Sequence, residues 1–105
     1  MGAGIVEVGF PTVDPAWSEA EVAAAAARFL AEREERWGDV REAMVAGEPL
    51  MALYLVAGLQ ARGVRCWTAT TERRTEVRPD GTKVSVFGFV RFRAWPRVRL
   101  DENGG

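Results

Sequence analysis

Hydrophobic and polar positions change their spacing several times along the chain, and each spacing predicts a different element. Residues 5–10 alternate modestly and are rich in β-branched and aromatic side chains, which predicts a first strand. Residues 40–46 are moderately apolar and lie directly before Gly47, which favours a second strand. Residues 64–71 and 84–95 are β-branched runs separated by charged residues and a Pro-Asp-Gly turn, so they predict a long β-hairpin.

A helical spacing begins after the first predicted strand. Residues 22–37 place apolar side chains three and four positions apart, with acidic residues mostly elsewhere, which predicts an amphipathic surface helix ended by Gly38. The start of this helix is indicated twice, by Asp14 before Pro15 and by a capping box that begins at Ser18.

A second helix is expected between the second strand and the hairpin. Residues 49–62 are apolar on nearly every side, with proline at the favoured first position and Gly63 just past the end, so this helix should be buried. Strands joined through helices run parallel, and a hairpin adds an antiparallel strand. The sequence therefore predicts an α/β fold, a single Rossmann-like β-α-β-α-β-β domain over residues 1–100. Its sheet is mainly parallel with an antiparallel C-terminal hairpin strand, and the polar residues 101–105 form a flexible tail.

The composition of the chain argues against several kinds of metal and catalytic site. Cys66 is the only cysteine among 105 residues, and the chain has no histidine, which argues against a disulfide, a zinc site and a histidine-based catalytic triad. We therefore expect no metal and no cofactor. No apolar stretch approaches the length of a membrane span and no secretion signal is evident, so we expect a soluble, cytoplasmic protein without a membrane partner.

Charge is distributed unevenly along the chain. Residues 1–61 carry four Arg against ten Asp and Glu, whereas residues 62–105 carry ten Lys and Arg against five Asp and Glu. Such asymmetry indicates an anion-binding half, or two complementary faces that meet in a dimer. The alternative is an acidic helix that faces water and a hairpin decorated with solvated arginines.

Ligands of open parallel sheets bind where the strands end, because loops and helix N-termini present unpaired backbone donors there. Three segments fit that description, residues 10–14, 47–49 and 70–74. Gly47 would let a ligand approach the backbone closely, and the following helix dipole favours phosphate. An ordinary strand-to-helix turn would also explain this glycine.

Four polar side chains lie at the end of the third predicted strand. Thr70 and Thr71 offer hydroxyl donors, and Arg73 and Arg74 offer guanidinium groups, which together suit a polyanionic ligand. Alternatively the threonines finish a strand and the arginines are solvated. Glu48 could accept a ribose hydroxyl bond or act as a base, or it could cap the second helix.

A further pattern lies in the last predicted strand. Residues 86–92 resemble the aromatic strand with which RNA-recognition modules stack bases, although Ser85 and Val86 replace its leading basic residue and glycine. A strand that faces a core alternates in the same way. This pattern is the basis of an alternative function, a non-enzymatic module that binds RNA or senses a messenger. A third hypothesis is an interaction protein whose acidic first helix meets a basic partner.

One family resemblance covers somewhat more than half of the chain, from Gly38 to Trp95. It is carried by four pieces at compatible spacing, which are Gly47-Glu48-Pro49, Gly63-Val64 with Ala69-Thr70-Thr71-Glu72-Arg73, Asp80-Gly81-Thr82-Lys83, and the run from Phe87 to Trp95. These pieces resemble small CRISPR-associated Rossmann-like ring nucleases, related to CARF proteins, that accompany type III systems in antiviral defence.

The resemblance implies a homodimer with a basic cleft that binds a cyclic oligoadenylate second messenger and cleaves it without metal, by attack of a ribose 2′-hydroxyl on the adjacent phosphate. Such cleavage would switch off type III CRISPR signalling, and no DNA partner is expected. By position, the resemblance implies that Thr71 and Arg73 are catalytic and that the ligand is bound by Gly47, Glu48, Pro49, Leu50, Thr70 and Arg74.

The resemblance has one departure. Members of that family begin with an additional strand and a polar loop, whereas this chain starts almost directly at the segment that matches residues 4–10. Either the sheet lacks a strand or an upstream start was missed. If that loop contributes to catalysis, the chain would bind the messenger without cleaving it.

Overall fold

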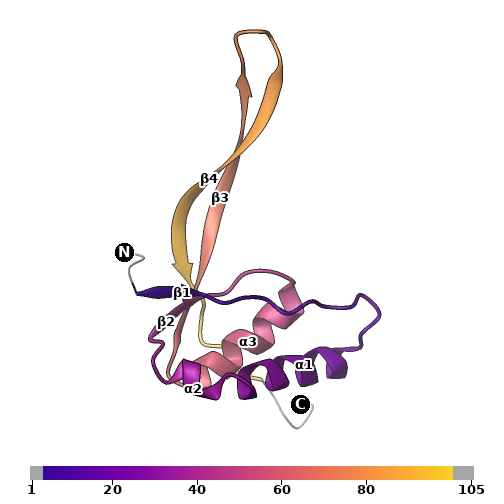
Figure 1. The fold of residues 1–105 in the computed structure, drawn as a ribbon, viewed down its shortest axis with the longest axis vertical. Helices are drawn as coiled ribbons and strands as arrows, with labels where there is room; N and C mark the ends of the chain where they lie inside the picture. Colours follow the sequence, from indigo (N-terminus) through magenta and orange to yellow (C-terminus); the bar gives the residue numbers. More distant parts are fainter. Residues whose placement is uncertain (1–3, 101–105) are drawn as a thin grey trace.

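The computed structural model describes residues 4–100, so the predicted tail at 101–105 lies outside the described residues. Four strands and three helices follow one another along these residues (Figure 1). Their bounds are β1 Ile5–Glu7, α1 Glu19–Ala31, α2 Glu34–Trp37, β2 Glu42–Met44, α3 Pro49–Ala61, β3 Arg65–Val77 and β4 Lys83–Ala94.

The strands form one mixed sheet in the order β1-β2-β3-β4. The first three strands run parallel and β4 is antiparallel to β3, as the sequence predicted. The register places Glu7 beside Met44 and Met44 beside Trp67, so the parallel part of the sheet is only three residues deep. Strands β1 and β2 are both shorter than expected, because the chain turns away into a loop after Glu7 and again after Met44.

Helices α1 and α3 lie side by side and cover one face of the sheet (Figure 1). Ala43 and Cys66 are register partners on that face, and both are buried against the helix layer together with Val45. Helix α3 contributes the largest share of the core, with Met51, Ala52, Leu55, Val56 and Leu59 buried. None of the helices in the described residues is long and apolar enough to cross a lipid bilayer.

The first predicted helix is divided into two. Ser18 begins α1 as the capping box, in which the Glu21 amide donates to Ser18 Oγ at 3.2 Å and the Ser18 amide donates to Glu21 Oε1 at 3.2 Å. The prediction of one helix as far as residue 37 was wrong, because α1 ends at Ala31. The buried Trp37 ring folds back and its Nε1 donates to the Leu30 carbonyl at 3.0 Å, which satisfies a carbonyl at the end of α1.

Strands β3 and β4 continue far beyond the other strands as a two-stranded ribbon, here called the arm and defined as residues 71–93 (Figure 1). The first hairpin strand was predicted to end at Thr71, but β3 runs on to Val77. The arm gives the molecule extents of 58 × 35 × 25 Å and a radius of gyration of 17.0 Å. A compact chain of this length would have a radius of gyration of about 13 Å.

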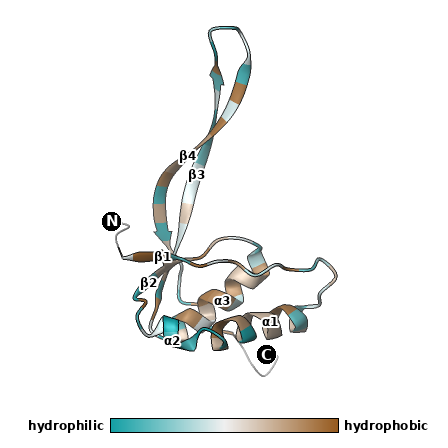
Figure 2. Ribbon diagram, in the orientation of Figure 1, coloured by the Kyte–Doolittle hydropathy of each residue, from teal (hydrophilic) through white to brown (hydrophobic). Residues whose placement is uncertain are grey.

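Successive side chains point to opposite faces of this ribbon, and a bulge in β4 opposite Thr70 and Thr71 shifts the register by one residue. Hydrophilic and hydrophobic residues follow one another along both strands of the arm (Figure 2). The face that continues the helix-covered side of the sheet is here called the helix-side face. It carries Thr68, Thr70, Glu72, Arg74 and Glu76 opposite Arg93, Arg91, Gly88, Val86 and Val84. The opposite face, called the uncovered face, carries Trp67, Ala69, Thr71, Arg73, Thr75 and Val77 opposite Ala94, Phe92, Phe89, Phe87, Ser85 and Lys83.

Candidate functional site

The ends of the parallel strands meet at the foot of the arm (Figure 1). The Val8 amide donates to the Met44 carbonyl at 3.2 Å, and the Val45 amide donates to the Trp67 carbonyl at 2.8 Å. Trp95 Nε1 donates to the Val45 carbonyl at 3.0 Å. These bonds hold the beginnings of the β1–α1 and β2–α3 loops against the strand pair from which the arm rises.

Gly47 lies in the β2–α3 loop with φ of 150°, a backbone conformation that favours glycine. A Cβ atom at this position would come within 2.8 Å of the Phe10 ring. The space that the missing side chain leaves is therefore filled by a ring of the same protein. The structural need for glycine at residue 47 is explained by Phe10 packing.

Glu48 caps helix α3, as one of its sequence interpretations held. The Leu50 amide donates to Glu48 Oε1 at 3.1 Å and the Met51 amide donates to Glu48 Oε2 at 2.8 Å. Pro49 occupies the first helical turn, where its missing N–H costs no bond. The carboxylate of Glu48 thus occupies the position at which a phosphate would meet the helix N-terminus.

The four polar residues expected at the end of the third strand lie within β3. Thr70 and Arg74 are on the helix-side face, whereas Thr71 and Arg73 are on the uncovered face. The structure therefore places Thr71 and Arg73, which were implied to be catalytic, on the opposite side of the ribbon from Thr70 and Arg74, which were implied to bind the ligand. Within one chain, these two pairs do not face a common ligand.

Arg73 is held in place on the uncovered face. Its Nε and Nη2 donate to Ser85 Oγ at 3.3 and 3.0 Å, and its guanidinium lies 5.7 Å from the centre of the Phe87 ring. Arg74, on the other side, lies 3.6 Å from the Glu72 carboxylate. Both side chains of this ion pair are more than half exposed, so the pair is a weak restraint on Arg74.

Two arginines on β4, Arg91 and Arg93, were not expected from the sequence to lie beside the candidate phosphate-binding residues. Arg91 is the register partner of Thr70, and Arg93 is the register partner of Thr68. All four therefore share the helix-side face at the foot of the arm, where directly opposite Cβ atoms lie about 5 Å apart. The available signal was the alternation of arginine with aromatic residues in the last strand.

Arg91 and Arg93 are free to bind an anion. The ion pairs among residues 4–100 are Arg62–Glu34 and Arg74–Glu72, so neither of these arginines has a carboxylate partner there. Arg91 Nε donates to the Phe92 carbonyl at 3.3 Å, which leaves its terminal nitrogens available, and Thr70 Oγ1 donates to the Arg91 carbonyl at 3.2 Å. The result is a cluster of two guanidinium and two hydroxyl groups.

The thiol of Cys66 lies beneath this cluster but is unsuited to attack a substrate. Its side chain is buried between the sheet and α3, and burial raises its pKa to about 11. It is therefore protonated at neutral pH, and the thiol is a poor nucleophile. Across residues 4–100, no three His, Cys, Asp or Glu side chains gather into a set that could hold a metal ion.

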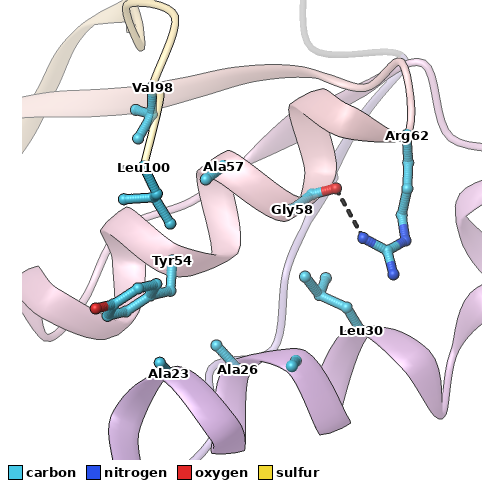
Figure 3. Close-up of a pocket in the computed structure, with 10 residues that line it drawn as sticks. Ala23, Ala26, Leu30, Tyr54, Ala57, Gly58, Arg62, Val98 and Leu100 are labelled. Carbon is cyan, nitrogen blue, oxygen red and sulfur yellow. Dashed lines mark hydrogen bonds between the residues drawn. The ribbon is translucent and has the colours of Figure 1, made fainter. Parts of the chain in front are cut away.

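A separate groove of about 350 Å³ lies between α1, α3 and the segment after β4 (Figure 3). Its walls are mostly apolar, with Ala23, Ala26 and Leu30 facing Ala57 and Val98. The polar groups at its ends are already bonded, since Arg62 donates to Glu34 and to the Gly58 carbonyl, and the Tyr54 hydroxyl donates to Glu19. Arg62 and Tyr54 thus already have partners within the chain, and the charge of Arg62 is balanced by Glu34.

The sequence profile described as the uncharacterized protein MJ1673 family matches residues 4–93. The chain belongs to this family. The matched residues include the three helices, the first three strands and the whole arm. The comparison with curated proteins gave no match, and neither did the comparison with solved structures.

Proposed function

We propose that this MJ1673 family member binds cyclic oligoadenylates at the foot of the arm, on the helix-side face, and cleaves them there without a metal ion. The observation that carries the proposal is the cluster of Thr68, Thr70, Arg91 and Arg93, whose guanidinium groups have no carboxylate partner among residues 4–100. In this proposal the β1-α1-β2-α3-β3 part is a Rossmann-like unit, and its strand ends hold the ligand.

The spacing of the cluster suits a chain of phosphates. Arg91 and Arg93 are two residues apart on one strand, which separates their Cα atoms by about 7 Å. Each guanidinium can then contact a different phosphate of an oligonucleotide, with two N–H groups directed at each set of oxygens. Thr68 and Thr70 add hydroxyl donors beside them. Arg74 lies further along β3 on the same face, where it pairs with Glu72.

The charge of the whole arm favours the same class of ligand. Residues 71–93 carry six Lys and Arg against three Asp and Glu, a net charge of +3. Residues 4–70 carry six Arg against ten Asp and Glu, a net charge of −4. A polyanion is therefore attracted to the arm and repelled by the body. Together with the resemblance to ring nucleases, this supports a cyclic oligoadenylate as the ligand and the cytoplasm as the location.

The chemistry requires positioning and charge stabilisation only. A ribose 2′-oxygen attacks the adjacent phosphorus, a P–O2′ bond forms, and the P–O5′ bond breaks. The 2′-hydroxyl proton passes through solvent to the departing 5′-oxygen, so the product is a linear adenylate with a 2′,3′-cyclic phosphate and a 5′-hydroxyl. Arg91 and Arg93 would stabilise the negative charge that develops on the phosphate oxygens, and binding would align the 2′-oxygen with the leaving group.

The proposed phosphate contacts differ from those first implied by the resemblance. Thr71 and Arg73 remain predicted catalytic residues, but they lie on the uncovered face, away from Arg91 and Arg93. Changing Arg73→Ala therefore separates the two assignments. Loss of cleavage with ligand affinity retained would place Arg73 in catalysis, whereas full activity would leave the helix-side cluster as the active region.

The test is incubation of the purified protein with cyclic tetra- and hexa-adenylate in the presence of a chelator, followed by mass spectrometry. We expect linear adenylates with cyclic-phosphate ends, and we expect their formation to be lost in an Arg91→Ala, Arg93→Ala double variant. The matched control is Arg97→Ala, which removes an arginine beyond the arm. Unchanged rings with all ring sizes, together with no rise in melting temperature, would refute the proposal.

A second candidate function is binding of linear RNA on the uncovered face. Phe87 and Phe89 are 67% and 61% exposed, and the Arg73 guanidinium lies beside the first of these rings. Exposed rings beside a cation suit the stacking of unpaired bases. Arg91, which completes the sequence pattern of an RNA-recognition strand, lies on the other face and would not contribute.

This alternative makes a distinct prediction. Linear oligoadenylate should bind with an affinity that falls as salt rises, and Phe87→Ala or Phe89→Ala should weaken it. Binding that is indifferent to both aromatic changes would exclude stacking on the uncovered face.

A further inference from the structure

The uncovered face continues from the sheet onto the arm as one apolar surface. At the body end, Met44 and Trp67 are register partners and are partly exposed. Along the arm, Phe92 and Phe89 follow, with ring centres 5.1 Å apart, and Phe87 comes next. No helix of the described residues lies over this face (Figure 1).

No residue of the arm is buried by other parts of the chain within residues 4–100. A two-stranded ribbon alone in water is at best marginally stable, and it normally gains stability from a second layer against an apolar face. Phe87, Phe89 and Val77 are each more than 60% exposed. Aromatic residues gathered on one surface of a protein mark an interaction site more often than isolated exposed side chains do.

Charge along this face indicates what covers it. At the body end, Glu7 and Glu42 lie on the uncovered face, together with Arg65, which is stacked on the Trp67 ring at 4.5 Å. That end carries a net negative charge. At the arm end, Arg73 and Lys83 lie on the same face and carry positive charge. A face with acid at one end and base at the other is complementary to a second copy of itself turned through 180°.

We propose that two copies of this chain pack their uncovered faces together about a two-fold axis, with the arm of each copy lying along the sheet of the other. The aromatic residues of both arms form the apolar centre, and the basic arm ends meet the acidic body ends. The helix-side cluster faces outward on each copy. This interface lies on the side of the ribbon away from Arg91 and Arg93, so its test does not depend on ligand binding there, but it would cover Thr71 and Arg73 and so exclude them as catalytic residues.

The test is the molar mass in solution, measured by size-exclusion chromatography with light scattering over a range of concentrations. We expect about 23 kDa, twice the 11.6 kDa of one chain, for the wild type. A Phe87→Glu, Phe89→Glu double variant should be monomeric at the same concentrations. The matched control is Val86→Glu, which adds one negative charge on the other face of the same strand and should remain dimeric.

Circular dichroism shows whether the aromatic variant folds. If it does not fold, an exchange of charges between Glu7 and Lys83 tests the proposal instead. Glu7→Lys and Lys83→Glu should each raise the dimer dissociation constant at least tenfold, and the combined variant should bring it back to within threefold of the wild type. A monomeric wild type, or a Phe87→Glu, Phe89→Glu variant that remains dimeric, would overturn the proposal. A monomer that binds linear RNA through Phe87 would instead support the stacking alternative.

Discussion

At the scale of single residues, Gly47 could be required either for packing or for the approach of a ligand. A glycine before a helix is expected wherever a ligand must approach the backbone, and the sequence alone could not exclude that reason. The structure shows the Phe10 ring at this position, within 2.8 Å of where a Cβ would lie. The sequence places residues 10–14 and 47–49 at the same end of the sheet, but nothing in it indicates that the Phe10 ring fills the space beside Gly47.

Changing Gly47→Ala should lower the free energy of unfolding by about 1–3 kcal/mol, because the new methyl group overlaps an aromatic ring and the backbone conformation is unfavourable for alanine. Chemical denaturation measures this change. The control is Gly9→Ala, where the structure has open space and an ordinary backbone, and where stability should change by less than about 0.5 kcal/mol. Equal stability of both variants would contradict the packing described for Phe10.

Glu48 leads to a second prediction at this scale. Its carboxylate accepts two amide bonds at the start of α3, so Glu48→Ala should destabilise the fold by about 1 kcal/mol. Glu48→Gln retains one acceptor oxygen and should lose less. If Glu48 is a cap and not a ligand contact, both variants should bind cyclic oligoadenylate with an affinity close to that of the wild type. Weaker binding at unchanged stability would assign Glu48 to the ligand.

At the scale of elements, local signals in the sequence predicted the helices well where caps were present. Ser18 begins α1, Pro49 begins α3, and Gly63 follows α3 with φ of 81°. The end of α1 was not predicted, because Trp37 has the helical spacing of a core residue. Trp37 lies in the separate helix α2, and its ring packs back against the end of α1. Periodicity cannot distinguish a residue on the helix from one that folds back onto it.

The length of the hairpin was also underestimated, for a different physical reason. Residues 72–77 are mostly charged, and strands are normally recognised by apolar residues that face a core. A ribbon that stands clear of the body has no core to face, so its strands can carry charge on both sides. Thr71 and Arg73 lie on the opposite face from Thr70 and Arg74 because β3 continues through all four residues. This division could not be expected while Arg73 and Arg74 were placed beyond the end of the strand.

At the scale of the whole molecule, the body, meaning the described residues outside the arm, should fold whether or not the arm is present. The buried core consists of residues between Val8 and Cys66, and it includes no residue of the arm. A shortened chain in which residues 72–88 are replaced by Asn-Gly would join Thr71 to Phe89 through a favoured hairpin turn. Such a chain retains the entire core.

We expect this shortened chain to fold as a monomer, with a free energy of unfolding within about 1 kcal/mol of that of the monomeric Phe87→Glu, Phe89→Glu variant. Circular dichroism and chemical denaturation provide the comparison. A shortened chain that lacks helical signal would show that the body depends on the arm, contrary to the burial pattern.

The body is acidic and the arm is basic, so the position of the arm in the molecule determines where a polyanion is attracted. The chain carries almost no net charge, so its ability to attract a polyanion depends on the arm standing apart from the body. Composition alone revealed opposite halves but not that the basic half projects. Binding through phosphates should therefore weaken steeply as salt increases.

The most direct test of the account is isothermal titration of cyclic tetra- and hexa-adenylate into the wild type, the Arg91→Ala, Arg93→Ala double variant and Arg73→Ala, all at one salt concentration. We expect the double variant to lose at least tenfold in affinity and Arg73→Ala to stay within about twofold, because only the first pair lies on the helix-side face. Undiminished binding by the double variant, or loss of binding in Arg73→Ala alone, would contradict the site described for the foot of the arm.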